Sequence, residues 1–176
     1  MDEIRVLSHA LDQTGDLLAQ VHVDQLSLPT PCADWTVAEL AAHLVAAPGR
    51  FLQMLNGEQP DWSATPAPIQ DRAAETFRNA ADDLIHAWHR QPAEAAAGAD
   101  WQTAEFAVHT WDLATAIGRS TDSLDPEVAE RGAAFMRANL TEENRDPVFG
   151  PEQDAPEDAD PYTRLAAFAG RSVGRE

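Results

Sequence analysis

Residues 101–118 read WQTAEFAVHTWDLATAIG, and this stretch carries the strongest fold signal in the chain. Apolar side chains recur in it every three or four residues, which is typical of a helix. Asp100 precedes it and can accept hydrogen bonds from the first free backbone N–H groups, and Gly118 is a usual helix-terminating residue. We therefore expect a helix from Trp101 to Ile117.

The composition outside this stretch also favours helices. Alanine dominates the apolar residues, which make up 44% of the sequence, while β-branched residues are sparse. A chain of 176 residues is long enough to bury the core of one domain. The expected fold class is all-α, with one principal domain and a tail.

Local signals mark the other helices. Thr36 opens TVAELAAHLV with Glu39 three residues on, which is a capping-box signature. Pro48 must end or kink this helix, and the apolar residues after it suggest a continuation. Asp125 followed by Pro126 opens a fifth helix. The expected further helices span about 2–21, 70–90, 125–140 and 161–170, with a Pro-rich loop at 56–69 and an extended acidic tail before the last helix.

The charge balance excludes several classes of partner. Thirty acidic and twelve basic residues give a net charge of −18, and every basic residue is Arg. Such a surface repels phosphate backbones and anionic lipid, so we expect no nucleic-acid partner and no membrane partner. The acidic start lacks the features of a signal peptide, and no apolar run is long enough to span a membrane. The expected location is cytoplasmic.

The single cysteine, Cys32, excludes an internal disulfide and any zinc finger built from cysteines. It lies in a turn, four residues before the predicted helix at Thr36. Activation of its thiol would require a cationic or helix-terminal neighbour. A packed, unreactive thiol is the favoured interpretation.

Glu105 and His109 are four residues apart, so on a helix their side chains point the same way and can share one ion. Asp112 lies three residues further along. Helical projection places these residues and Gln102 on a strip between two apolar flanks. From periodicity alone, this strip is a solvent-facing surface, and a metal site is the alternative.

Other histidines offer weaker candidates. His43 borders the apolar stripe of its helix, where a hydrogen-bonded boundary residue and a metal ligand are both consistent with the sequence. His86 and His89 are three residues apart, but projection directs His86 away from the apolar stripe and His89 to its flank. We interpret these two as surface residues.

Two motifs carry a resemblance to a known family. TPCADWTVAELAAHL (30–44) and AEFAVHTWDLATAIGR (104–119) resemble the metal-binding domain of the mycothiol-dependent maleylpyruvate isomerase family, within the DinB-like four-helix superfamily. The closing FGPEQDAPEDADPYTRLAAFAGR (149–171) resembles a small actinobacterial branch of it. The resemblance implies a DinB-like four-helix metal-binding bundle over residues 1–120. An additional C-terminal helix and an extended acidic tail, residues 121–176, would pack on the same domain.

The resemblance also implies a ligand set. Its motif positions are filled here by His43, Glu105 and His109, so the strip on the fourth helix should face a cleft between helices. Two imidazoles and a carboxylate are typical of a catalytic zinc site with an open position. Zinc is the expected divalent ion, and nickel and iron are alternatives. Asp112 would orient His109 or a bound water from behind.

The implied activity is metal-dependent activation of mycothiol or a related thiol for S-transfer to, or isomerisation of, a small electrophile. The expected partners are that small-molecule thiol and the electrophile, and a homodimer stays open. The family's isomerase carries a separate C-terminal domain for which this chain has no room, which argues against maleylpyruvate isomerisation itself. The alternatives are a non-catalytic metal- or small-ligand-binding module acting with a partner, and a metal-dependent hydrolase that uses bound hydroxide.

Overall fold

The chain folds into helices joined by loops. The computed structural model describes residues 2–32, 35–69, 71–145 and 149–173. Within these ranges the only pairing of extended backbone is a single bridge between Pro29 and Thr36. The all-α prediction is therefore confirmed. The helices are α1 (Asp2–Leu18), α2 (Val37–Leu55), α3 (Ala73–Trp88), α4 (Ala99–Ala116), α5 (Pro126–Asn139) and α6 (Pro161–Phe168), with short 3-10 helices η1 (Val23–Gln25) and η2 (Ala93–Gly98).

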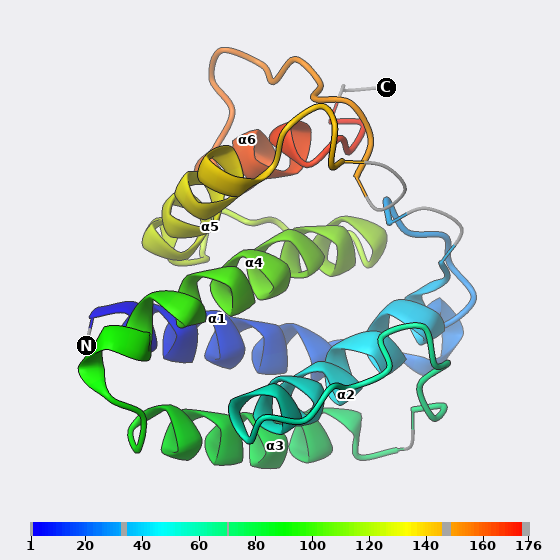
Figure 1. The fold of residues 1–176 in the computed structure, drawn as a ribbon. Coiled ribbons are helices and arrows are strands. Elements are labelled where there is room, and N and C mark those ends of the chain that lie inside the picture. Colours follow the sequence, from blue (N-terminus) through cyan, green and yellow to red (C-terminus); the bar gives the residue numbers. More distant parts are fainter. Residues whose placement is uncertain (1, 33–34, 70, 146–148, 174–176) are drawn as a thin grey trace.

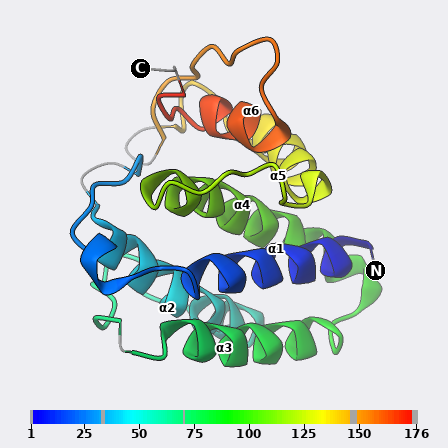
Figure 2. The same cartoon turned by 180° about the vertical axis from the view of Figure 1, so that it is seen from behind.

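Helix α4 lies at the centre of the molecule. Helices α1 and α2 each contact both α3 and α4, which makes a four-helix bundle of the DinB-like type. On its other side, α4 contacts α5 and α6. Figures 1 and 2 show α4 running between α1 and α2 on one side and α5 and α6 on the other. Most of its residues are buried as a result. No helix in the described ranges is both long and apolar enough to cross a membrane.

The start of α2 forms as the sequence predicts. Thr36 accepts a hydrogen bond from the backbone N–H of Glu39, and the Glu39 carboxylate accepts one from the backbone N–H of Thr36 at 2.8 Å. The helix then runs through Pro48 to Leu55 as one element. The continuation predicted beyond Pro48 is confirmed, and this helix carries His43 into the interior.

Several predicted helix boundaries were wrong. The first helix ends at Leu18, three residues early, and the predicted start at Gln70 lies outside the described residues. Asp100 does not cap the fourth helix, because η2 runs directly into α4 and its carbonyls already accept from the backbone N–H of Ala99. The Asp100 carboxylate instead accepts from Arg131 Nε at 2.7 Å.

Both C-terminal helices begin at an aspartate cap, of which only Asp125 was predicted. Asp125 accepts a hydrogen bond from the backbone N–H of Glu127, and Asp160 accepts from the first turn of α6. The predicted docking of the last helix is confirmed, since Tyr162, Leu165 and Phe168 are buried. The described residues between α5 and α6 are irregular, as expected for the acidic tail.

Candidate metal centre

Helices α2 and α4 bring the three predicted ligand residues together. His43 comes from α2, while Glu105 and His109 lie one turn apart on α4. One potential ligand atom from each residue lies within 4.8 Å of the others. Glu105 Oε1 is 2.8 Å from His43 Nε2 and 3.3 Å from His109 Nε2, so two imidazoles converge on one carboxylate oxygen.

The candidate cluster is mostly buried, and the solvent-facing interpretation of the α4 strip was wrong. His43 and His109 are 9% and 8% exposed, and Asp112 is fully buried. Gln102 is also buried, and its side-chain oxygen accepts from Trp88 Nε1 at 2.9 Å. Projection of α4 failed because other helices cover this helix on opposite sides, so its polar strip faces protein.

The charges of this cluster are coupled. Burial opposes ionisation of Glu105, but the His109 and His43 imidazoles outweigh it and lower the pKa of the carboxyl well below its usual range. Burial likewise disfavours a charged His109, yet Glu105, with hydrogen bonds to Asp112 and Cys32, raises its pKa above the ordinary value. Without a metal ion, a proton on His109 supplies the positive charge that balances the Glu105 carboxylate. A cation placed among these atoms would supply that charge in its place.

Asp112 lies behind His109, on the side of the ring away from Glu105. His109 Nδ1–H donates to Asp112 Oδ2 at 3.0 Å. This hydrogen bond leaves Nε2 as the ring atom that faces His43 and Glu105. Asp112 is thus placed as expected for a residue that orients His109. Burial raises the pKa of its carboxyl, but His109 and Arg171 outweigh burial and lower it.

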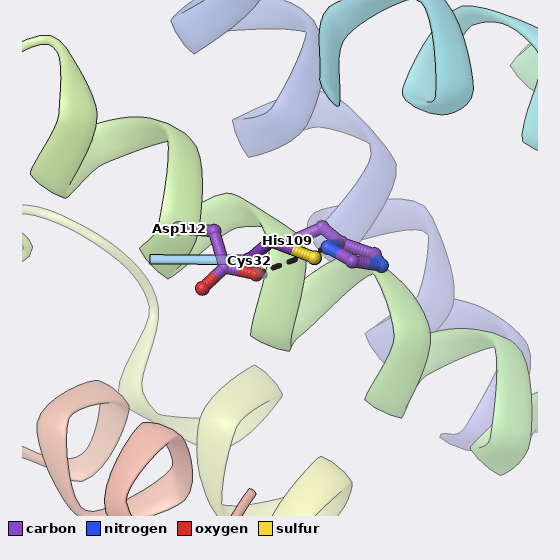
Figure 3. Close-up of side chains that lie close together, drawn as sticks. All are labelled: Cys32, His109 and Asp112. Atoms are coloured by element: carbon purple, nitrogen blue, oxygen red, sulfur yellow. Dashed lines mark hydrogen bonds and ion pairs between the residues drawn. The ribbon is translucent and has the colours of Figure 1, made fainter. Parts of the chain in front are cut away.

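A second group of potential ligands adjoins the first. Cys32 Sγ, His109 and Asp112 also offer atoms within 4.8 Å of one another, and Figure 3 shows the thiol beside the imidazole and the carboxylate. Arg171, however, donates to both Asp112 oxygens, at 3.1 and 2.9 Å, and its Nη2 is 3.6 Å from Cys32 Sγ. A metal ion here would meet a fixed positive charge. The group with His43 and Glu105 is therefore the better cation site.

Sequence reasoning did not predict Cys32 and Arg171 as parts of this site. They are 139 residues apart, and no local pattern around either one indicates the contact. Cys32 is partly exposed, and Arg171 is its cationic neighbour. The sequence indicated no such neighbour, and for that reason a packed, unreactive thiol was the favoured interpretation. The resemblance of residues 149–171 to a family branch is the one signal that singled out this end of the chain.

A cavity of about 480 Å³ adjoins His43. Its walls are mainly apolar and include Trp35, whose ring centroid is 4.9 Å from that of His43, and Trp62. Glu39 also lines it, with its carboxylate engaged in the α2 cap. Arg50 lies over the Trp62 ring and donates to a backbone carbonyl. The cavity suits a small ligand with an apolar body.

Comparisons with known proteins identify the family of this chain. Residues 7–114 match the model of the mycothiol maleylpyruvate isomerase N-terminal domain, and this segment contains all three predicted ligands. The chain is 33% identical to an uncharacterized protein of Mycobacterium tuberculosis strain H37Rv and to one of strain CDC 1551 / Oshkosh, over 98% of this chain and 100% of each relative. No solved structure gave a significant match. The chain belongs to the mycothiol maleylpyruvate isomerase N-terminal domain family.

Proposed function

We propose that this protein is a metal-dependent enzyme that activates a low-molecular-weight thiol of the mycothiol type. The activated thiol is used for S-transfer to, or isomerisation of, a small electrophile. The observation that carries the proposal is the convergence of His43, Glu105 and His109 within 4.8 Å, inside the segment that defines the family. We propose a thiol of the mycothiol type because the name of the family includes mycothiol.

The donor set fits a divalent metal ion. His43 and His109 would offer their Nε2 atoms and Glu105 a carboxylate oxygen, which is a catalytic zinc type of set with room for a further ligand. Zinc is the ion of first choice, with nickel and iron as alternatives that the same donors accept. When bound, such an ion lowers the pKa of a thiol or water beside it.

The residues around the donors would orient His109 and bind the electrophile. Asp112 holds the ring of His109 through Nδ1–H and so keeps Nε2 directed at the site. The apolar cavity beside His43 would receive the electrophile, and the rings of Trp35 and Trp62 would exclude water from it. Because water is excluded, hydrolysis of the electrophile competes less with attack by the thiol.

The hydrolase alternative is less well supported. It requires a general base for the attacking water, and Asp112, which contacts His109, is the carboxylate beside the three donors that could take this role. Asp112 is fully buried, and its oxygens accept from His109 and Arg171. A carboxylate held in this way is a poor proton acceptor for a water in the site.

The decisive test measures thiol consumption. The protein is purified without chelators, loaded with zinc and mixed with mycothiol and a panel of alkylating electrophiles, while free thiol is followed over time. We expect metal-dependent loss of thiol with the wild type and with the surface control His86→Ala/His89→Ala, and none with His43→Ala. Isomerisation would regenerate the thiol, so conversion of the electrophile is followed as well. Metal binding with neither thiol loss nor thiol-dependent conversion of the electrophile would instead support a non-catalytic module, and turnover without thiol would support a hydrolase.

A further inference from the structure

The chain returns to the metal centre after α6. Arg171 lies three residues beyond the end of α6 and outside residues 7–114, the segment that the family model covers. Its side chain is 7% exposed although it carries a charge. A buried guanidinium is costly unless its hydrogen bonds are satisfied, so its partners indicate what it does.

The backbone at the end of α6 directs Arg171 toward α4. Gly170 has a φ of +83°, which favours glycine, and a Cβ there would approach Gly150 O to 2.5 Å. The backbone N–H of Arg171 donates to Ala166 O at 2.9 Å, and its Nη1 donates to Ala169 O at 3.2 Å. Both the turn and the side chain are therefore fixed by local contacts.

The guanidinium holds Asp112 by two parallel hydrogen bonds. Nε donates to Oδ1 at 3.1 Å and Nη2 donates to Oδ2 at 2.9 Å, a bidentate geometry that fixes the plane of the carboxylate. Oδ2 also accepts from His109 Nδ1–H. Without Arg171, the buried carboxylate of Asp112 would keep His109 as its remaining charged partner and would be free to turn.

We infer that Arg171 is a positioning residue of the metal centre, acting through Asp112 to hold the ring of His109. The chain of contacts runs from Arg171 to Asp112, then to His109 Nδ1, and leaves Nε2 directed at Glu105 and His43. The inference rests on the proposed function in one respect, namely that the site binds a metal ion. The orientation of the ring itself does not depend on a metal.

Arg145 provides a matched control from the same end of the chain. It is also buried, at 9% exposure, and its Nη1 donates to Phe168 O at 2.7 Å and to Gly150 O at 3.1 Å. Its guanidinium lies 4.6 Å from the centroid of the Phe168 ring. Arg145 thus ties down the C-terminal segment through contacts other than Asp112.

The test compares Arg171→Met, Arg171→Lys and Arg145→Met in two measurements. The first is the Nδ1–H proton resonance of His109 in metal-free protein, by NMR. The second is the affinity for Co²⁺, by optical titration. We expect Arg171→Met to lose the resonance and to bind Co²⁺ on the order of tenfold more weakly, as for other partners of metal ligands. Arg171→Lys should fall between it and the wild type, and Arg145→Met should retain both properties.

Retention of both properties by Arg171→Met, or an equal loss in Arg145→Met, would overturn the inference. If Arg171→Met does not fold, an Arg171→Lys protein identical to the wild type in both measurements overturns it. A wild type that binds no Co²⁺ refutes the proposed function, whereas loss of the His109 resonance in Arg171→Met still supports positioning. Wild-type binding with an unchanged Arg171→Met refutes positioning alone.

Discussion

Two places in the chain offer a pair of potential metal ligands about one helical turn apart: His86 with His89 at the end of α3, and Glu105 with His109 on α4. His86 in the last turn of α3 and His89, the residue that follows this helix, are exposed and join no group of three potential ligands among the described residues. Glu105 and His109 on α4 face His43 on α2, with ligand atoms within 4.8 Å. Spacing along one helix therefore permits a shared ion but does not create a site. A second helix that delivers a further donor is what distinguishes the two pairs.

The difference follows from where the two helices lie. α3 packs on α1 and α2 at the outside of the bundle. Its polar side chains are mostly exposed. α4 lies between α1 and α2 on one side and α5 and α6 on the other, so its polar strip is enclosed. Enclosure gives polar side chains fixed partners, whereas the exposed His86 and His89 keep the rotamer freedom of surface residues.

The largest expected effect comes from His109→Ala. This change removes a donor atom and also leaves buried Asp112 without one of its partners. We expect zinc affinity to fall by more than about 100-fold, above the range typical of outer partners. Competition with a chromophoric chelator measures the affinity, and His89→Ala at the end of α3 is the control with unchanged affinity. Equal affinities for the two variants would contradict the distinction between α3 and α4.

Glu105→Gln should have the next largest effect. Glutamine keeps the size of the side chain but removes the negative charge on which both imidazoles converge. We expect zinc affinity to fall by roughly 10- to 100-fold. The same titration on Glu75→Gln, a change at an exposed position on α3, should show wild-type affinity. Wild-type zinc affinity in Glu105→Gln would show that the Glu105 carboxylate is not a ligand.

The affinity for metal should rise with pH. Glu105 and the hydrogen bond to Asp112 outweigh burial and raise the pKa of His109, so metal-free protein holds a proton there that the ion must displace. Below that pKa, each unit of added pH should strengthen binding by up to about tenfold, and above it the gain should cease. Calorimetric titrations in buffers of different ionisation enthalpy count the released protons. Affinity that does not change between about pH 6 and 8 would contradict this assignment.

The smallest effect compares the starts of α2 and α3. Thr36 and Glu39 form a capping box at the start of α2, whereas α3 begins after Arg72 without a side-chain cap. Thr36→Ala should lower the free energy of unfolding by about 1 kcal/mol. Arg72→Ala should change it by less than about 0.5 kcal/mol. Urea denaturation measures both, and equal losses would show that the capping box does not set α2 apart.

Local signals predicted the fold well because they act within one turn of helix. Thr36 with Glu39, and Asp125 with Pro126, mark true helix starts. Gly118 follows the last residues of α4 with a φ of +68°, as expected for a helix-terminating glycine. Asp100 misled the prediction, because whether a carboxylate caps a helix or pairs with Arg131 depends on a distant element.

The candidate metal centre was predictable only in part. The motifs around His43, Glu105 and His109 identified the cluster through a family resemblance, while periodicity alone directed α4's polar strip to solvent. That error arose because projection assumes one buried face, and α4 is covered on opposite sides. Arg171 was missed because its contact with Asp112 spans 59 residues and depends on how α6 packs.

A crystal structure of zinc-loaded protein, with anomalous scattering recorded at the zinc edge, tests the central claim most directly. We expect an ion coordinated by His43 Nε2, Glu105 and His109 Nε2, at about 2.0–2.2 Å, with its open position toward the cavity beside Trp35. Zinc bound at His86 and His89, zinc bound by Cys32 and Asp112, or the absence of zinc from the three-residue cluster would contradict it.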